Sequence, residues 1–100
     1  MGKILVIDDD AATRRLLRET LTSSGYEVAE ATNGEEGFQK AQAEKPDLII
    51  ADILMPVRDG YQLAKDLRNN PDTASMPIMM LTGLAGMIGT DLWWRLADQR

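Results

Sequence analysis

The sequence contains no cysteine and no histidine. The absence of cysteine excludes disulfides, thiolate metal sites and cysteine nucleophiles. The absence of histidine excludes His-based acid–base catalysis and His-ligated zinc. Any metal that this chain binds must therefore be a hard cation with oxygen ligands, such as Mg²⁺.

Basic residues and long apolar runs are also scarce. Eleven Lys and Arg stand against 16 Asp and Glu, which gives a formal net charge of −5 and argues against nucleic acid as a direct partner. No apolar stretch approaches the length of a bilayer, and Met1-Gly2-Lys3 leads into a short apolar run rather than a signal peptide. We therefore expect a cytoplasmic protein with no membrane partner. The nucleotide-binding patterns G-x-G-x-x-G and G-x-x-x-x-G-K-[ST] are missing as well.

What the chain does contain is an alternation of apolar strands and amphipathic helices. A length of 100 residues, 44% of them hydrophobic, indicates one domain with a core. The periodicity predicts strands at 3–7, 26–31, 48–53 and 77–81 and helices at 11–24, 34–44 and 61–69. Such alternation implies right-handed crossovers and a parallel α/β sheet.

Local signals support the helix boundaries. Asp10 is a candidate N-cap for the first helix, and Gly25 falls where glycine is favoured just past a helix end. Thr32-Asn33-Gly34-Glu35 resembles a capping box that opens the second helix. Gly37 inside that helix should cost about 1 kcal/mol relative to Ala.

Two helices have predicted core faces. In the first helix we expect an apolar face of four residues: Ala12, Leu16, Leu17 and Leu21. In the third, Leu63 and Leu67 should face inward at i, i+4 spacing.

The third strand carries a carboxylate at its end. Leu48-Ile49-Ile50-Ala51-Asp52-Ile53 is a short apolar run, and Pro56 follows it closely. Asp52 therefore sits near the carboxyl end of a central strand, where open α/β sheets place their ligands. The alternative for Asp52 considered alone is an aspartate that caps the following loop.

Further polar side chains follow the other strands. Asp8 and Asp9 come directly after the first strand, and Thr82 comes after the fourth. The carboxyl ends of parallel strands meet at one edge, so these side chains can converge with Asp52. Clustered carboxylates repel one another unless a cation intervenes, and Mg²⁺ suits them. We assign Asp8 and Asp9 to the metal, Asp52 to nucleophilic attack on a phosphoryl group and Thr82 to a hydrogen bond to that group. A solvated acidic run is the alternative for Asp8-Asp9.

These motifs resemble the response-regulator receiver domains of two-component signalling. The resemblance rests on I-L-V-I-D-D, I-I-A-D-I-L-M-P-V-R-D-G and P-I-M-M-L-T-G, with D-x-x-M-P-x-x-D-G the most specific segment, and it covers residues 3–83. It implies a flavodoxin-like, three-layer αβα fold, a bound Mg²⁺ ion and a phosphoryl group received from a histidine kinase or phosphotransfer protein. By the same resemblance Asp52 is the phosphoacceptor, Asp8 and Asp9 the acidic pair, and Thr82 the switch hydroxyl. The backbone carbonyl of Leu54 completes the metal shell, and Asp59-Gly60 shapes the loop behind the site.

The remainder of the chain departs from this family. We divide it into a receiver-like core at 1–83 and a divergent, helical tail at 84–100, which contains the adjacent Trp93 and Trp94. Nothing after Thr82 resembles the fifth strand and fifth helix of receivers, and residues 83–100 contain no Lys. Arg95 or Arg100 could substitute for the family's lysine, although Arg is not equivalent to a lysine point charge. One tryptophan of the pair can lie on a partner-covered patch, or both can be partly buried.

Two consequences and three functions follow from that departure. Strand 78–81 becomes an apolar edge, so we expect a homodimer or swapped assembly through it or through the Trp93-Trp94 tail. We also expect weakened phosphorylation. The favoured function is a phosphorelay receiver, not an enzyme. A Mg²⁺-dependent phosphatase is disfavoured because Leu54 stands where such enzymes place a second Asp, and a receiver-like scaffold or engineered fragment acting through dimerisation is the other alternative.

Overall fold

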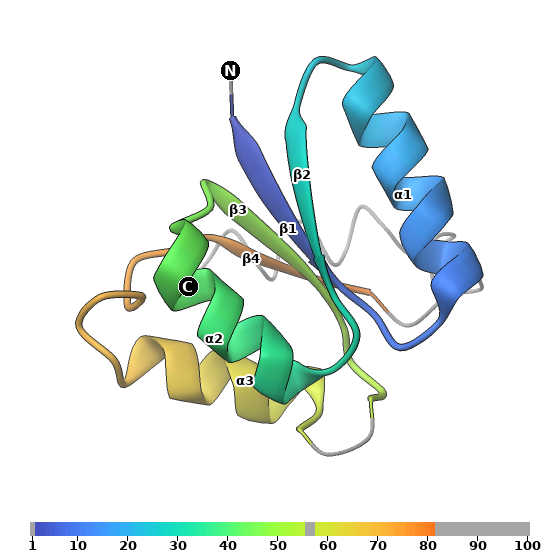
Figure 1. Ribbon diagram of the computed structural model, residues 1–100. Coiled ribbons are helices and arrows are strands. Elements are labelled where there is room, and N and C mark those ends of the chain that lie inside the picture. The colour runs from blue at the N-terminus through green and yellow to red at the C-terminus, as the bar shows by residue number, and fades with distance from the viewer. Residues whose placement is uncertain (1, 56–57, 82–100) are drawn as a thin grey trace.

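The chain forms a parallel four-stranded sheet between two helical layers in the computed structural model, which describes residues 2–55 and 58–81 (Figure 1). Its strands are β1 (Lys3–Ile7), β2 (Glu27–Ala31), β3 (Leu48–Asp52) and β4 (Ile78–Leu81). Its helices are α1 (Ala11–Ser23), α2 (Gly34–Glu44) and α3 (Gly60–Arg68). The order across the sheet is β2-β1-β3-β4, with every neighbouring pair parallel. This is the predicted flavodoxin-like architecture, and it places β1 and β3 in the interior.

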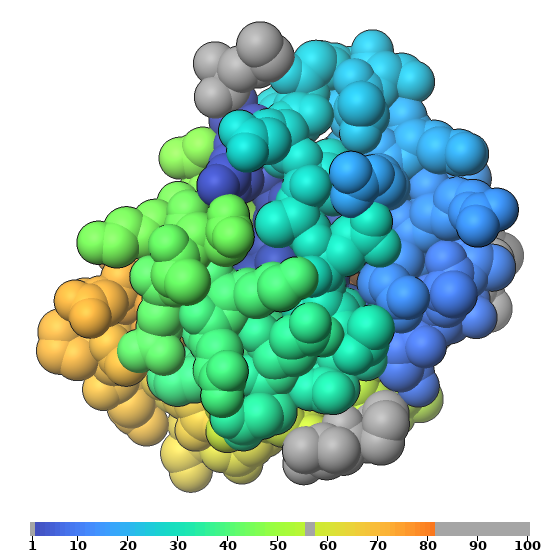
Figure 2. Space-filling view, viewed as in Figure 1, coloured from blue at the N-terminus to red at the C-terminus, as the bar shows by residue number. Residues whose placement is uncertain are grey.

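Alternating side chains of the buried strands give the sheet two apolar faces. Leu5, Ile7 and Ile49 belong to a cluster that includes Leu63 and Leu67 of α3, all of them fully buried. The opposite face carries Ile4, Val6 and Ile50 among other residues, and Leu17 and Leu21 of α1 pack against it. Figure 2 shows α1, in blue, along the right side of the molecule and α2, in blue-green to green, across the middle of the face in view. The inward positions predicted for Leu63 and Leu67 are confirmed.

The predicted apolar face of α1 was partly wrong. Leu17 and Leu21 pack on the sheet, but Leu16 is 45% exposed and Ala12 is also exposed, while Thr13 is buried. The helix begins after Asp10, whose side chain accepts hydrogen bonds from the amide and hydroxyl of Thr13. The inward stripe therefore runs through residues 13, 17 and 21 at i, i+4 spacing.

The helix boundaries follow from capping. Gly25 has φ 95°, the left-handed conformation that favours glycine after a helix. At the start of α2, Asn33 is the N-cap and accepts from the amide of Glu36 at 2.8 Å. Glu36 in turn accepts from the amide and hydroxyl of Thr32. The N-cap and the capping glutamate are thus Asn33 and Glu36, each one residue later than Thr32 and Glu35 of the predicted box, while the helix begins at Gly34 as predicted.

Gly37 has a packing role that its helix propensity does not indicate. A Cβ atom at Gly37 would lie 2.5 Å from Cδ1 and 2.9 Å from Cγ1 of the fully buried Ile7. The missing side chain therefore lets α2 lie close against β1. Close packing on the interior strand offsets the unfavourable helix propensity of glycine.

Several expectations concern residues outside the described part of the chain. They are the position of Thr82, the helical tail at 84–100 with Trp93 and Trp94, the Arg95 or Arg100 substitution, and the missing fifth strand and helix. Among the described strands, β4 is the outer one next to β3. None of the described helices combines the length and apolar character that crossing a bilayer requires.

Candidate metal centre

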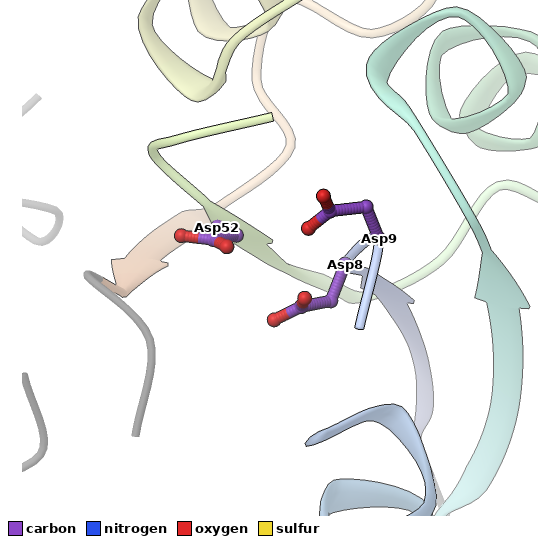
Figure 3. A group of neighbouring side chains, drawn as sticks. All are labelled: Asp8, Asp9 and Asp52. Carbon is purple, nitrogen blue, oxygen red and sulfur yellow. The ribbon is translucent and has the colours of Figure 1, made fainter. Parts of the chain in front are cut away.

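Three carboxylates gather at the carboxyl edge of the sheet. Asp8 and Asp9 follow β1, and Asp52 is the last residue of β3, which pairs directly with β1 in parallel register. One oxygen from each of the three lies within 4.8 Å of the others, and Figure 3 shows the three side chains grouped around the two strand ends. The predicted convergence of Asp8, Asp9 and Asp52 is therefore present.

Asp8 is a buried carboxylate with one unused oxygen. Its residue is 2% exposed, and Oδ1 accepts a hydrogen bond from the amide of Asp10 at 2.9 Å. Oδ2 is buried and has no hydrogen-bond partner among the described residues. An unsatisfied buried acceptor costs about 1 to 3 kcal/mol, and more when it is charged. A cation bound to Asp8 Oδ2 would satisfy this acceptor.

The electrostatics of the cluster also favour a cation. Burial raises the pKa of Asp8 to about 6, against the hydrogen bond from Asp10 and with added repulsion from Asp52 and Asp9. The pKa of Asp52 is raised by its burial, opposed by the hydrogen bond from Leu54, and raised further by the negative charge of Asp9. A divalent ion would reverse these effects by stabilising the ionised forms.

Among residues 2–55 and 58–81, no basic side chain forms an ion pair with these three carboxylates. One basic side chain, that of Arg14, contacts the backbone beside these carboxylates instead. Arg14 donates from Nη1 to the carbonyl oxygen of Asp8 at 2.7 Å, and its Nε lies 3.3 Å from Glu30 Oε1. Arg14 thus ties the ends of β1 and β2 together and leaves the carboxylate oxygens available. Oxygen ligands with unpaired charge are the donor set that Mg²⁺ prefers.

The loop after β3 is held close to Asp52. The amide of Leu54 donates to Asp52 Oδ1 at 3.2 Å, and the Leu54 side chain is 75% exposed. The amide of Gly60 donates to the carbonyl of Ile53 at 2.9 Å. A Cβ at Gly60 would lie 2.7 Å from the carbonyl oxygen of Asp52, so only glycine allows this approach. Asp59 caps α3 by accepting from the amide of Gln62.

Thr82 lies outside the described residues. Leu81, the last described residue of β4, is in register with Asp52, and its carbonyl accepts from the amide of Ile53 at 2.8 Å. The roles predicted for Thr82 and for the Leu54 carbonyl therefore remain predictions. Sequence reasoning did not find Arg14 or Arg58, whose partners lie on other elements; the only signal for Arg58 is its position just before Asp59-Gly60.

Known proteins resemble this chain in sequence. The family model for the response regulator receiver domain matches residues 4–89. The probable transcriptional regulator ycf27 of Pyropia yezoensis is 48% identical over 82 residues, which is 82% of this chain and 32% of that protein. The alkaline phosphatase synthesis transcriptional regulatory protein PhoP of Bacillus subtilis is 46% identical over 80 residues, which is 80% of this chain and 32% of that protein.

Solved structures give the same assignment. The chemotaxis response regulator CheY4 of Vibrio cholerae matches with a TM-score of 0.80 and 34% identity, covering 97% of this chain and 80% of that one. The N-terminal domain of a response regulator receiver protein from Methanoculleus marisnigri matches with a TM-score of 0.80 and 28% identity, covering 93% and 79%. This chain spans about a third of the length of its curated relatives. It belongs to the response regulator receiver domain family of two-component signalling.

Proposed function

We propose that this receiver domain accepts a phosphoryl group on Asp52 from a histidine kinase or phosphotransfer protein, in a step that requires Mg²⁺. The observation that carries the proposal is the grouping of one oxygen each of Asp8, Asp9 and Asp52 within 4.8 Å, with a buried Asp8 oxygen that has no hydrogen-bond partner among residues 2–55 and 58–81. A carboxylate cluster built only for solubility would not bury an acceptor without a partner.

Each of these residues has a separate role in the proposed phosphoryl transfer. Asp8, Asp9, Asp52 and the carbonyl of Leu54 would hold the ion, which neutralises negative charge on the phosphoryl oxygens. An oxygen of Asp52 forms a bond to phosphorus while the P–N bond of the phosphohistidine breaks. The electron pair of that bond stays on the imidazole nitrogen of the donor, which then takes a proton from solvent. The Thr82 hydroxyl donates to a phosphoryl oxygen.

Incubation with Mg²⁺ and acetyl phosphate, followed by intact mass spectrometry, tests this function. We expect one phosphoryl adduct on the wild-type chain and on Asp72→Asn, a control at an exposed surface aspartate. Asp52→Asn should carry none, and wild-type protein in excess EDTA should carry none. An adduct that persists on Asp52→Asn would reject Asp52 as the acceptor.

The composition of residues 83–100 leads to a second expectation for the same assay. These residues contain no Lys, so within the 100 residues the tail at 84–100 supplies no lysine point charge to the phosphoryl group. We infer that the adduct forms slowly and changes the oligomeric state little. A stoichiometric, long-lived adduct that shifts the sedimentation coefficient would contradict this inference.

A scaffold that acts through dimerisation is the second candidate function. It is favoured by β4, which is one of the two outer strands of the described sheet and carries the apolar run Ile78-Met79-Met80-Leu81. Sedimentation velocity of the unphosphorylated chain separates the two candidates. A dimer at micromolar concentration that persists in Asp52→Asn supports the scaffold, and a monomer removes it.

The location of the domain, its lack of enzymatic turnover and its downstream process are also inferred. We place it in the cytoplasm, with no membrane partner, as an acceptor rather than an enzyme that turns over a substrate; receiver domains are not known as an enzyme family. The names of ycf27 and PhoP refer to transcriptional regulation, so control of transcription is a further proposal. The net charge of −5 argues against contact between this domain and DNA.

A further inference from the structure

Arg58 joins the loop after Asp52 to two helices. Its Nη2 donates to Glu35 Oε1 on α2, and its Nε lies 3.4 Å from Asp66 Oδ2 on α3. The guanidinium also lies over the ring of Phe38, 5.1 Å from the centroid. The Arg58 side chain is 21% exposed, so these interactions are less screened by water than an ordinary surface ion pair.

The backbone of Arg58 makes a second contact with α2. A Cβ at Gly34, the first residue of α2, would lie 2.7 Å from Arg58 Cβ and 3.0 Å from its carbonyl carbon. The start of α2 therefore packs directly on the main chain at Arg58. The ion pair with Glu35 and this backbone contact therefore both join Arg58 to α2.

A displacement of Arg58 would be transmitted to Asp52 through Gly60, which follows Arg58 by two residues. Gly60 donates to the carbonyl of Ile53 and approaches the carbonyl of Asp52 too closely to admit a Cβ. Leu54 then donates from its amide to Asp52 Oδ1. Gly60 thus lies against the end of β3, and Arg58, two residues before it, is attached to the helical layer.

We propose that Arg58 is a positioning residue for the Asp52 site. Resting on the function proposed above, the inference is that its bonds to Glu35 and Asp66 hold the loop so that the Asp52 carboxylate and the Leu54 carbonyl are placed to hold Mg²⁺. Arg58 touches neither the metal nor the phosphoryl group. Its Nη1 is buried and has no hydrogen-bond partner among the described residues.

The test compares Arg58→Met and Glu35→Gln with Arg18→Met. Arg18 also forms an ion pair, 2.6 Å from Glu30 Oε2, but it is 52% exposed and lies on α1. Three quantities are measured for each variant: the Mg²⁺ dissociation constant by calorimetry, the phosphorylation rate with acetyl phosphate at saturating Mg²⁺, and the free energy of unfolding by urea in EDTA.

We expect Arg58→Met to raise the Mg²⁺ dissociation constant roughly tenfold, the effect usual for residues that orient metal ligands. The phosphorylation rate should also fall several-fold at saturating Mg²⁺. Glu35→Gln should have a smaller effect in the same direction, and adding it to Arg58→Met should change little, because both remove one linkage. Arg58→Lys should recover only part of the affinity, since Lys cannot contact both acids with a planar fork.

If Arg58 only stabilises the fold, Arg58→Met gives a different result. The substitution then lowers the free energy of unfolding in EDTA but leaves the Mg²⁺ dissociation constant and the phosphorylation rate equal to those of Arg18→Met. That result overturns the proposal. If Arg58→Met does not fold, Glu35→Gln decides by the same comparison. If wild-type protein binds Mg²⁺ without being phosphorylated, the proposed function fails. The positioning role of Arg58 is then tested by the Mg²⁺ dissociation constants of the variants alone. If wild-type protein binds no Mg²⁺, both proposals are rejected.

Discussion

Asp8 shows how burial and charge compete at a single residue. The carboxylate is almost fully buried beside Asp9 and Asp52, and one of its oxygens has no hydrogen-bond partner in the described part of the chain. Burial raises its pKa from 3.8 to about 6. The folded protein therefore binds a proton at Asp8 more readily than the unfolded chain does. Without metal, the ionised form of Asp8 opposes folding at neutral pH.

The pH dependence of the free energy of unfolding follows from this raised pKa of Asp8. As pH rises from 3.8 to about 6 the unfolded chain loses this proton first, so the contribution of Asp8 to stability falls and stays low above about pH 6. We expect Asp8→Asn to be more stable than wild type at pH 8 in EDTA, by on the order of 1 to 3 kcal/mol. At pH 5 the difference should shrink. Urea unfolding at both pH values measures it, with Asp72→Asn as an exposed control. Equal stability of Asp8→Asn and wild type at pH 8 would contradict the prediction.

At the scale of elements, α2 connects the core to the loop beside the site. Gly37 lets it lie against Ile7 of β1, and Gly34 lets its first turn lie against Arg58. Both glycines are buried. The position of α2 is therefore set by two close approaches, one at the sheet and one at the loop.

Substitution at Gly37 separates packing from helix propensity. Gly37→Ala would normally gain about 1 kcal/mol in a helix. Here the new methyl group meets the fully buried Ile7, and overpacking of a core costs about 1 to 3 kcal/mol. We expect a net loss of stability in urea unfolding, partly restored by adding Ile7→Val, which removes the nearest atom. Gln39→Ala on the exposed side of α2 should change stability little. A more stable Gly37→Ala would show that Ile7 moves aside freely.

At the scale of the whole molecule, the parallel sheet gathers residues from distant segments at one edge. Asp8 and Asp52 are 44 positions apart in sequence, yet they meet because β1 and β3 are neighbours running in the same direction. A ligand bound there contacts two interior strands at once. Its binding free energy should therefore appear as stability of the entire domain.

Mg²⁺ should raise the unfolding free energy of the domain by an amount that grows with the logarithm of its concentration above the dissociation constant. At 100 times the dissociation constant the expected gain is about 2.7 kcal/mol. Asp9→Asn should lose most of this gain, while Glu19→Gln, at an exposed position of α1, should keep it. Thermal unfolding with and without EDTA measures the effect. A gain that survives Asp9→Asn would place the ion elsewhere.

Much of the fold could be predicted from local patterns. Strand and helix boundaries agree with the structure to within one residue, because apolar runs, Asp10 and Gly25 are signals that act over a few positions. The grouping of Asp8, Asp9 and Asp52 followed from parallel topology alone. Leu16 was placed wrongly because a stripe of leucines does not reveal which of two adjacent leucines faces the sheet.

Contacts between elements had no comparable signal. The approach of Gly37 to Ile7 depends on how close α2 lies to the sheet, and helix propensity describes only the isolated helix. The links from Arg58 to Glu35 and Asp66 join residues 23 and 8 positions away on separate helices. Such pairs become visible only when the helices are placed in space.

The amino-terminal ends of the strands lie at the opposite end of the sheet from the three carboxylates. There Lys3 begins β1, donates from its amide to Asp47 and forms an ion pair with Glu44, a whole strand away from Asp8. A tether attached near Lys45 would anchor the domain by this far side. The acidic edge would then face the solution, so a biosensor surface prepared in this way would present every molecule with the same orientation toward an incoming phosphodonor.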